Sequence, residues 1–145
     1  KRNSEEDESL HVKYVIPKAG SKIYLGQAQI TFYGPLENNY KYGRQVNLNV
    51  RQENKYSIVT RIVYGKNSFL MTGDAQRETI EKIIKKGYNL QAQVLKEPHH
   101  GYQDVKEKDK LIAGRTSDHK LLIDHTKANI AVISNGYKNT GGRLN

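Results

Sequence analysis

Two short polar blocks hold the side chains best suited to chemistry, and each follows the end of an apolar run. One reads Leu-Met-Thr-Gly-Asp-Ala over residues 70–75, and the other reads Leu-Lys-Glu-Pro-His-His-Gly-Tyr over residues 95–102. They place the carboxylate of Asp74 and the imidazoles of His99 and His100 at the ends of two successive predicted strands. Such groups are ligands of zinc, manganese or iron at hydrolytic sites. The blocks therefore predict a catalytic metal site built from these three residues.

Each block also has a simpler explanation. An aspartate directly before a helix is a common N-cap, which needs no metal, and a pair of histidines after a strand can be an incidental polar turn. Adjacent side chains on extended backbone point to opposite sides, so we expect at most one of His99 and His100 to point straight at the site. The sequence does not rank the two. Asp74 is predicted to lie within several Å of at least one of them.

Four further residues are candidates for contacts with a substrate, because they end the second block or lie at or just before the start of a predicted strand. They are Asn54, Ser57, Gly101 and Tyr102. For Asn54 and Ser57 the alternative is a plain turn that starts a strand. The three remaining histidines are interpreted as structural or exposed; they are His11, His119 and His125.

The elements that must position these side chains follow from the spacing of apolar residues. Alternation and β-branched content predict strands, with a strand pair in the second range and a Gly-Lys-Asn hairpin turn at 65–67. The strand ranges are Leu10–Pro17, Lys22–Tyr33, Ser57–Tyr64, Ser68–Thr72, Gln91–Lys96 and Ile130–Ser134, the last expected to be buried. Helical spacing predicts two helices, over Ala75–Lys86 and Asp118–His125.

Each predicted helix has one apolar side. Ile80, Ile83 and Ile84 should face the sheet while the lysines of the same helix face solvent. In the second helix the expected apolar side is Leu121, Leu122 and His125. Strands that come first and then alternate with helices predict a mixed α/β (α+β) fold, a sheet covered by helices on one face.

Charge and composition restrict the partners. The 145 residues carry a formal charge of +9. Residues 1–9 hold two basic and four acidic side chains, so the remaining 22 basic and 11 acidic side chains give residues 10–145 a charge of +11. This excess favours a polyanionic partner such as DNA, although evenly spread lysines also serve solubility alone. No apolar run approaches the roughly 18 residues of a membrane span.

Residues 1–9 are all polar and are predicted to be a disordered or linker segment, with one domain over residues 10–145. The polar start, without Met, predicts that the chain is a piece of something longer. Cysteine is absent, which excludes disulfides and thiolate ligands. This absence is compatible with an extracytoplasmic or membrane-associated bacterial setting, and a cytoplasmic one stays open.

Five blocks in order resemble metallo-β-lactamase-fold hydrolases, in particular the branch with the hydrolase domain of competence (DNA-internalisation) proteins and the choline-binding phosphodiesterases. The blocks are Asn54–Val59, Tyr64-Gly65, Phe69–Ala75, Val94–Lys96 with His99–Gly101, and Ala131–Gly136. In that branch, a strand ending in Leu-Thr-Gly-Asp-Ala supplies an aspartate that bridges two divalent metal ions, zinc or manganese. A strand ending in Lys-x-x-His-His-Gly supplies a further site histidine. The resemblance implies these roles for Asp74 and for His99 or His100.

The departures from the family are informative. Its main metal motif, His-x-His-x-Asp-His, belongs in the half of the fold that precedes these blocks, and the chain contains no such sequence. The resemblance therefore implies the C-terminal half of an αβ/βα sandwich, inactive without the missing N-terminal half. A half-sandwich should leave one apolar sheet face open, and the candidates for that face are Ile58, Ile62, Leu70 and Val132.

The resemblance implies a metal-dependent phosphodiesterase or nuclease that uses a metal-activated water. Two other functions stay open. One is a non-catalytic module that binds a polyanion through its basic surface, with the histidines as relics. The other is a hydrolase of the same fold that acts on another ester or a lactone.

Overall fold

The computed structural model describes residues 6–7, 12–13, 16–36, 54–101 and 118–134. The expectations for His11, Tyr102 and most of the predicted linker lie outside these residues. In residues 1–15, only Glu6–Asp7 (β1) and Val12–Lys13 (β2) are described, as a short antiparallel pair separate from the main sheet.

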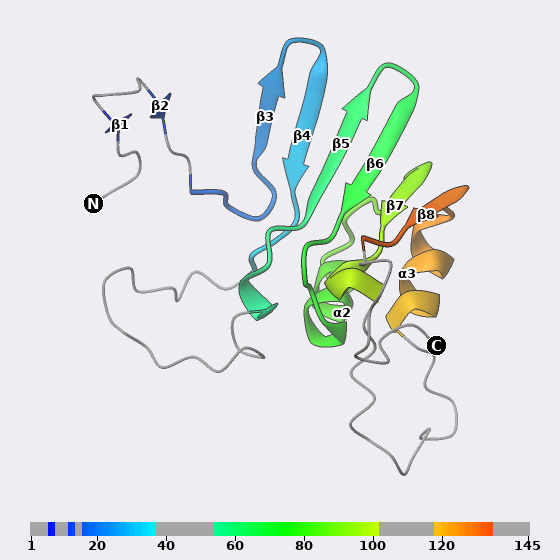
Figure 1. The fold of residues 1–145 in the computed structure, drawn as a ribbon. Helices are drawn as coiled ribbons and strands as arrows, with labels where there is room; N and C mark the ends of the chain where they lie inside the picture. The colour runs from blue at the N-terminus through cyan, green and yellow to red at the C-terminus, as the bar shows by residue number, and fades with distance from the viewer. Residues whose placement is uncertain (1–5, 8–11, 14–15, 37–53, 102–117, 135–145) are drawn as a thin grey trace.

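The main sheet has six strands in sequence order, so each strand lies beside the next one along the chain (Figure 1). Adjacent strands are antiparallel from the first to the fourth, and the fourth, fifth and sixth strands are parallel to one another. The strands are β3 (Lys22–Leu25), β4 (Ala28–Phe32), β5 (Thr60–Tyr64), β6 (Asn67–Met71), β7 (Val94–Lys96) and β8 (Ile130–Val132). The predicted mixed α/β class is confirmed.

Both antiparallel hairpins turn on glycine. Leu25 pairs with Ala28, and Tyr64 pairs with Asn67, so each turn has two central residues. The first central residue is Gly26 or Gly65, each with φ of 56°. Positive φ at this position gives the turn the twist that adjacent strands need, and glycine adopts it without steric cost. The predicted strand pair and hairpin turn are confirmed.

Helices α2 (Arg77–Lys85) and α3 (Asp118–Thr126) fill the connections between the parallel strands and share one core with the sheet. In α2, Ile80 and Ile83 are 2% exposed, Ile84 packs against the same core, and Lys85 and Lys86 are exposed. The predicted apolar stripe of this helix is confirmed. The sheet contributes Leu70 and Leu95 to this core, both 0% exposed, and α3 contributes Leu122.

Three detailed expectations are wrong. Leu70 was expected on the open face, but it pairs with Leu95 on the face that the helices cover. The last strand was expected to be buried, but β8 is the final strand of the described sheet and all of its residues are exposed. His125 was expected on the apolar side of its helix. It is exposed, and its Nδ1 lies 2.8 Å from the carbonyl oxygen of Leu121.

The sheet face away from the helices is apolar and open. One row of register partners crosses all six strands on this face, and cross-strand partners share a face. The row consists of Ile23, Ile30, Ile62, Phe69, Val94 and Ile130. No member belongs to the buried core, and Ile23 and Ile130 are 40% and 57% exposed. We call this surface the open face. The predicted position on this face is confirmed for Ile62 and for Val132, which is 44% exposed. Ile58 is also exposed.

No helix in the described part of the chain is long and apolar enough to cross a membrane.

The tyrosine directly after β4 makes folding sensitive to alkali. Tyr33 is buried, donates a hydrogen bond of 2.6 Å to the carbonyl oxygen of Asn89, and stacks on Tyr88. Burial raises the pKa of the Tyr33 phenol above its usual 10.0, although the charge of Arg61 opposes the rise. The folded pKa therefore exceeds the unfolded one, so the neutral phenol's contribution to stability is fully present below pH 10.

We predict that this contribution is lost as pH rises above 10 through the folded pKa. The difference in unfolding free energy between the wild type and Tyr33→Phe, from urea denaturation, should be constant up to pH 10 and then fall. A difference that stays constant to pH 11 would show that the phenol titrates alike in both states.

Candidate metal centre

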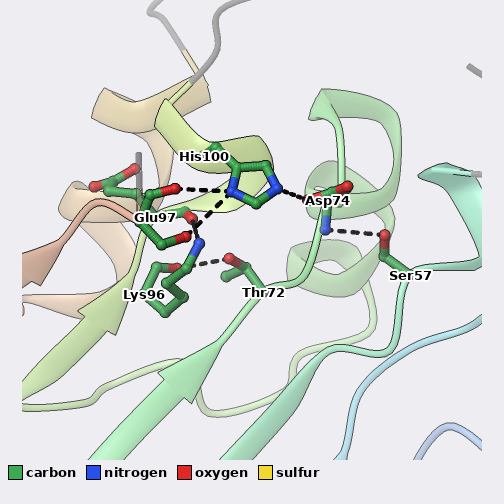
Figure 2. Close-up of polar contacts among 7 residues, drawn as sticks. Ser57, Thr72, Asp74, Lys96, Glu97 and His100 are labelled. Atoms are coloured by element: carbon green, nitrogen blue, oxygen red, sulfur yellow. Dashed lines mark hydrogen bonds and ion pairs between the residues drawn. The ribbon is translucent and has the colours of Figure 1, made fainter. Parts of the chain in front are cut away.

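The turn after β6 presents Asp74 at the carboxyl end of the sheet. The Thr72 hydroxyl donates to the carbonyl oxygen of Lys96 (2.6 Å), and the backbone N–H of Asp74 donates to the Ser57 hydroxyl (3.1 Å) (Figure 2). Gly73 has φ of 55°, and a Cβ there would lie 3.3 Å from the Cβ of Ser57. The turn is thus held from two neighbouring segments, and its carboxylate stays 42% exposed.

The N-cap explanation for Asp74 is wrong. The N-cap of α2 is Gln76, in extended conformation and without a side-chain capping bond. The carboxylate of Asp74 is therefore not used to satisfy the first amides of the helix. A carboxylate in the strand-to-helix turn is available for another purpose.

His100 faces this carboxylate from the end of β7. Its Nε2 lies 3.6 Å from Oδ1 of Asp74 (Figure 2). Its Nδ1 lies 2.8 Å from the carbonyl oxygen of Ser134. A carbonyl oxygen accepts hydrogen bonds only, so Nδ1 carries the proton and donates it. In a neutral imidazole, Nε2 then keeps its lone pair and directs it toward Asp74. A hydrogen bond from the other ring nitrogen to a backbone carbonyl oxygen is the usual second contact of a metal-binding histidine.

Both histidines lie in the left-handed region, His99 with φ of 50° and His100 with φ of 55°. The expectation of extended backbone at this pair is wrong. Non-glycine residues in this region cost about 1–2 kcal/mol each, and such strain is concentrated at functional sites. The backbone N–H of His99 donates to the carbonyl oxygen of Gly73 (3.0 Å), which ties the two polar blocks together. Of the pair, the structure places His100 against Asp74.

The candidate substrate residues lie in different environments. Ser57 lies at the site, where its hydroxyl oxygen accepts the bond from Asp74. Asn54 begins the short 3₁₀ helix η1 (Asn54–Tyr56), is 8% exposed, and accepts a backbone bond from Ser57. Gly101 ends the 3₁₀ turn η2 (Pro98–Gly101) with φ of 76°. Tyr102 lies outside the described residues. The geometry therefore favours Ser57 over Asn54 as a residue near a ligand.

Sequence reasoning missed Ser134, whose carbonyl oxygen and hydroxyl both lie within hydrogen-bond distance of His100. A signal for it existed, because Ser134 follows β8 and the carboxyl ends of parallel neighbours meet at one edge of a sheet. Thr72 was also missed, although its hydroxyl fixes the turn to Lys96. In the described ranges, no three residues of the His, Cys, Asp and Glu types lie close enough together to hold a metal ion. Among the described residues, Asp74 and His100 therefore stand as a pair, with no third residue of these types close to both.

A scan against protein-family models matched no family, and a search of curated proteins found no match.

Proposed function

We propose that the chain is the C-terminal half of a metallo-β-lactamase-fold hydrolase domain, a metal-dependent phosphodiesterase or nuclease that requires its N-terminal half for activity. The observation that carries the proposal is the orientation of His100, whose Nδ1 is bound to Ser134 while its Nε2 faces Asp74.

The donor set fits a divalent ion. Two ligand atoms about 2.1 Å from one ion lie about 3.4 Å apart in tetrahedral geometry, near the 3.6 Å between Nε2 of His100 and Oδ1 of Asp74. Imidazole and carboxylate suit zinc and manganese. A pair of such ions, when bound, supplies an activated water and neutralises charge on the phosphodiester.

The roles of the chain's own groups follow from their contacts. Asp74 offers a carboxylate in a fixed turn, and Ser134 keeps the proton of His100 on Nδ1 so that Nε2 can bind. Ser57 fixes the backbone of Asp74 and still has its own hydroxyl proton to donate toward a substrate oxygen. His99 is proposed to contact substrate or to support the turn, because its backbone joins the two blocks.

Two ligands are too few for a complete centre, since zinc sites use three or four protein ligands and two-metal sites use more. Isolated, the pair should bind metal weakly. This agrees with a chain that contributes one side of a site and receives the remaining ligands from the missing half.

The open face supports the same proposal. Two packed sheets bury their facing apolar side chains between them. The apolar row from Ile23 to Ile130 is continuous across the sheet, whereas the apolar residues of an ordinary surface are scattered singly. A second layer placed there, as in the αβ/βα sandwich, would bury this row and leave the Asp74 edge at the rim between the layers.

A second candidate is a non-catalytic module that binds a polyanion. The incomplete donor set and the charge of +11 on residues 10–145 favour it. It differs from the first in requiring no metal and no intact Asp74–His100 pair.

The proposal is tested by hydrolysis of bis(p-nitrophenyl) phosphate and of a DNA oligonucleotide, with zinc or manganese supplied. A domain that contains this chain and its upstream half should turn over, while the 145-residue chain alone should stay at background. Robust metal-dependent hydrolysis by the isolated chain would contradict the proposal. An inert complete domain that still binds DNA would favour the polyanion-binding module.

A further inference from the structure

A hollow of about 350 Å³ opens at the other end of the sheet from Asp74. Its lining includes Ser68 in β6, four residues and roughly 13 Å of strand before Thr72. It lies on the helix-covered face, where the buried residue Ala92 belongs both to its lining and to the core, and none of the residues at the Asp74 turn lines it.

Three cations surround the hollow, and none of its described lining residues is acidic. They are Arg61 on β5, Lys66 in the β5–β6 turn and Lys127 just after α3. Nε of Arg61 donates to the carbonyl oxygen of Gln91 (2.7 Å), which holds the guanidinium in place and leaves its terminal amino groups for another acceptor. No carboxylate of a described residue pairs with Lys66 or Lys127.

The negative groups near Lys127 are already engaged. Asp124, one turn earlier on α3, lies 2.9 Å from Nζ of Lys120. Two carbonyl oxygens at the C-terminal end of α3 accept backbone bonds, that of Ile123 from Lys127 and that of Thr126 from Ala92. The helix dipole reduces the positive potential here by about half a charge, which leaves a clear excess from three cations.

Neutral donors add to the charges. The side-chain oxygen of Gln93 accepts a bond of 2.7 Å from the backbone N–H of Ser68, so its amide NH₂ is left to donate. Thr126 also lines the hollow, is 1% exposed, and its hydroxyl has no hydrogen-bond partner among the described residues. An anion with several oxygens can accept from many of these donors at once, and a guanidinium fork matches phosphate in particular.

We propose that this hollow binds a phosphate group, either free or carried by a nucleic-acid strand. The ligand is held by Arg61, Lys66 and Lys127, with the amide of Gln93 as a neutral donor. The site is separate from the Asp74–His100 pair, and it stands whether or not the chain belongs to a hydrolase.

The test uses the 145-residue chain and the double variant Lys66→Gln/Lys127→Asn. Asparagine suits position 127, where φ is 50°, better than most residues, and Lys66 is exposed in a turn, so the fold should survive. The control is Lys85→Gln/Lys86→Gln, which removes two exposed lysines, the last residue of α2 and its C-cap. Arg61 is left unchanged because its bond to Gln91 is structural.

Inorganic phosphate, titrated at constant ionic strength, should shift the amide NMR signals of Ser68, Gln93 and Lys127 in the wild type and the control but not in the double variant. Binding of a 20-nucleotide single-stranded DNA gives the second measurement. If a strand delivers the phosphate, the slope of log K against log salt should be about 1.4 smaller in the double variant, about 0.7 for each lost contact. An unchanged slope together with the phosphate shifts supports free phosphate as the ligand.

Two results would overturn the proposal. One is the absence of shifts at these three amides in the wild type. The other is an equal loss of DNA affinity in the control, which would mean that general surface charge, and no defined site, attracts anions.

Discussion

Replacing Asp74 with Ala should abolish metal-dependent phosphodiester cleavage by the complete domain, a loss on the order of 10³-fold or more. The carboxylate is held at the strand end by the bond from its N–H to Ser57 and is 3.6 Å from the ring of His100. Losing a metal ligand forfeits several kcal/mol of transition-state stabilisation, which corresponds to that factor. Initial rates at saturating zinc or manganese measure the effect.

Three further variants serve as a control for this result and separate the roles of the two histidines. Asp124→Ala removes an exposed carboxylate of α3 that pairs with Lys120, and its rate should equal that of the wild type. His100→Ala should mainly weaken metal retention, whereas His99→Ala should mainly impair turnover. An Asp74→Ala domain that keeps more than a tenth of the wild-type rate would remove Asp74 from the proposed centre.

Replacing Leu70 with Ala should lower the unfolding free energy by about 2–5 kcal/mol, because it deletes a fully buried side chain where β6 meets the helices. The matched control is Leu25→Ala, in the same sheet but 74% exposed, which should change stability by less than about 0.5 kcal/mol. Chemical denaturation of both variants measures the difference.

This comparison also tests which face of the sheet is packed. Comparable losses for Leu70→Ala and Leu25→Ala would show that the open face is buried in solution, for example in a dimer. Sedimentation of the wild type at the same concentration would then reveal the second copy.

Local patterns made several elements predictable. The spacing of Ile80, Ile83 and Ile84 indicates the buried side of α2 because a helix has a single periodicity. Gly26 and Gly65 mark the hairpins because the two-residue turns need positive φ. The nearness of Asp74 to one of the histidines was also predictable, since neighbouring strand ends meet at one edge of a sheet.

Features that depend on tertiary placement could not be predicted. Leu70 lies in an apolar run, and a strand of this kind does not reveal which of its two faces the helices cover. Likewise, Ile130 looks buried by composition, but its face is the one without helices. The choice of His100 over His99 depends on left-handed backbone and on Ser134, which lies 34 residues farther along the chain.

NMR of the histidine ring nitrogens during a zinc titration shows whether Asp74 and His100 can share a divalent ion. We predict that at pH 8 the ring of His100 carries its proton on Nδ1 and that zinc shifts its Nε2 signal, with weak affinity in the isolated chain. The shift should disappear in Asp74→Ala. A His100 ring that does not respond to zinc, or that responds equally without Asp74, would show that the two residues do not share an ion.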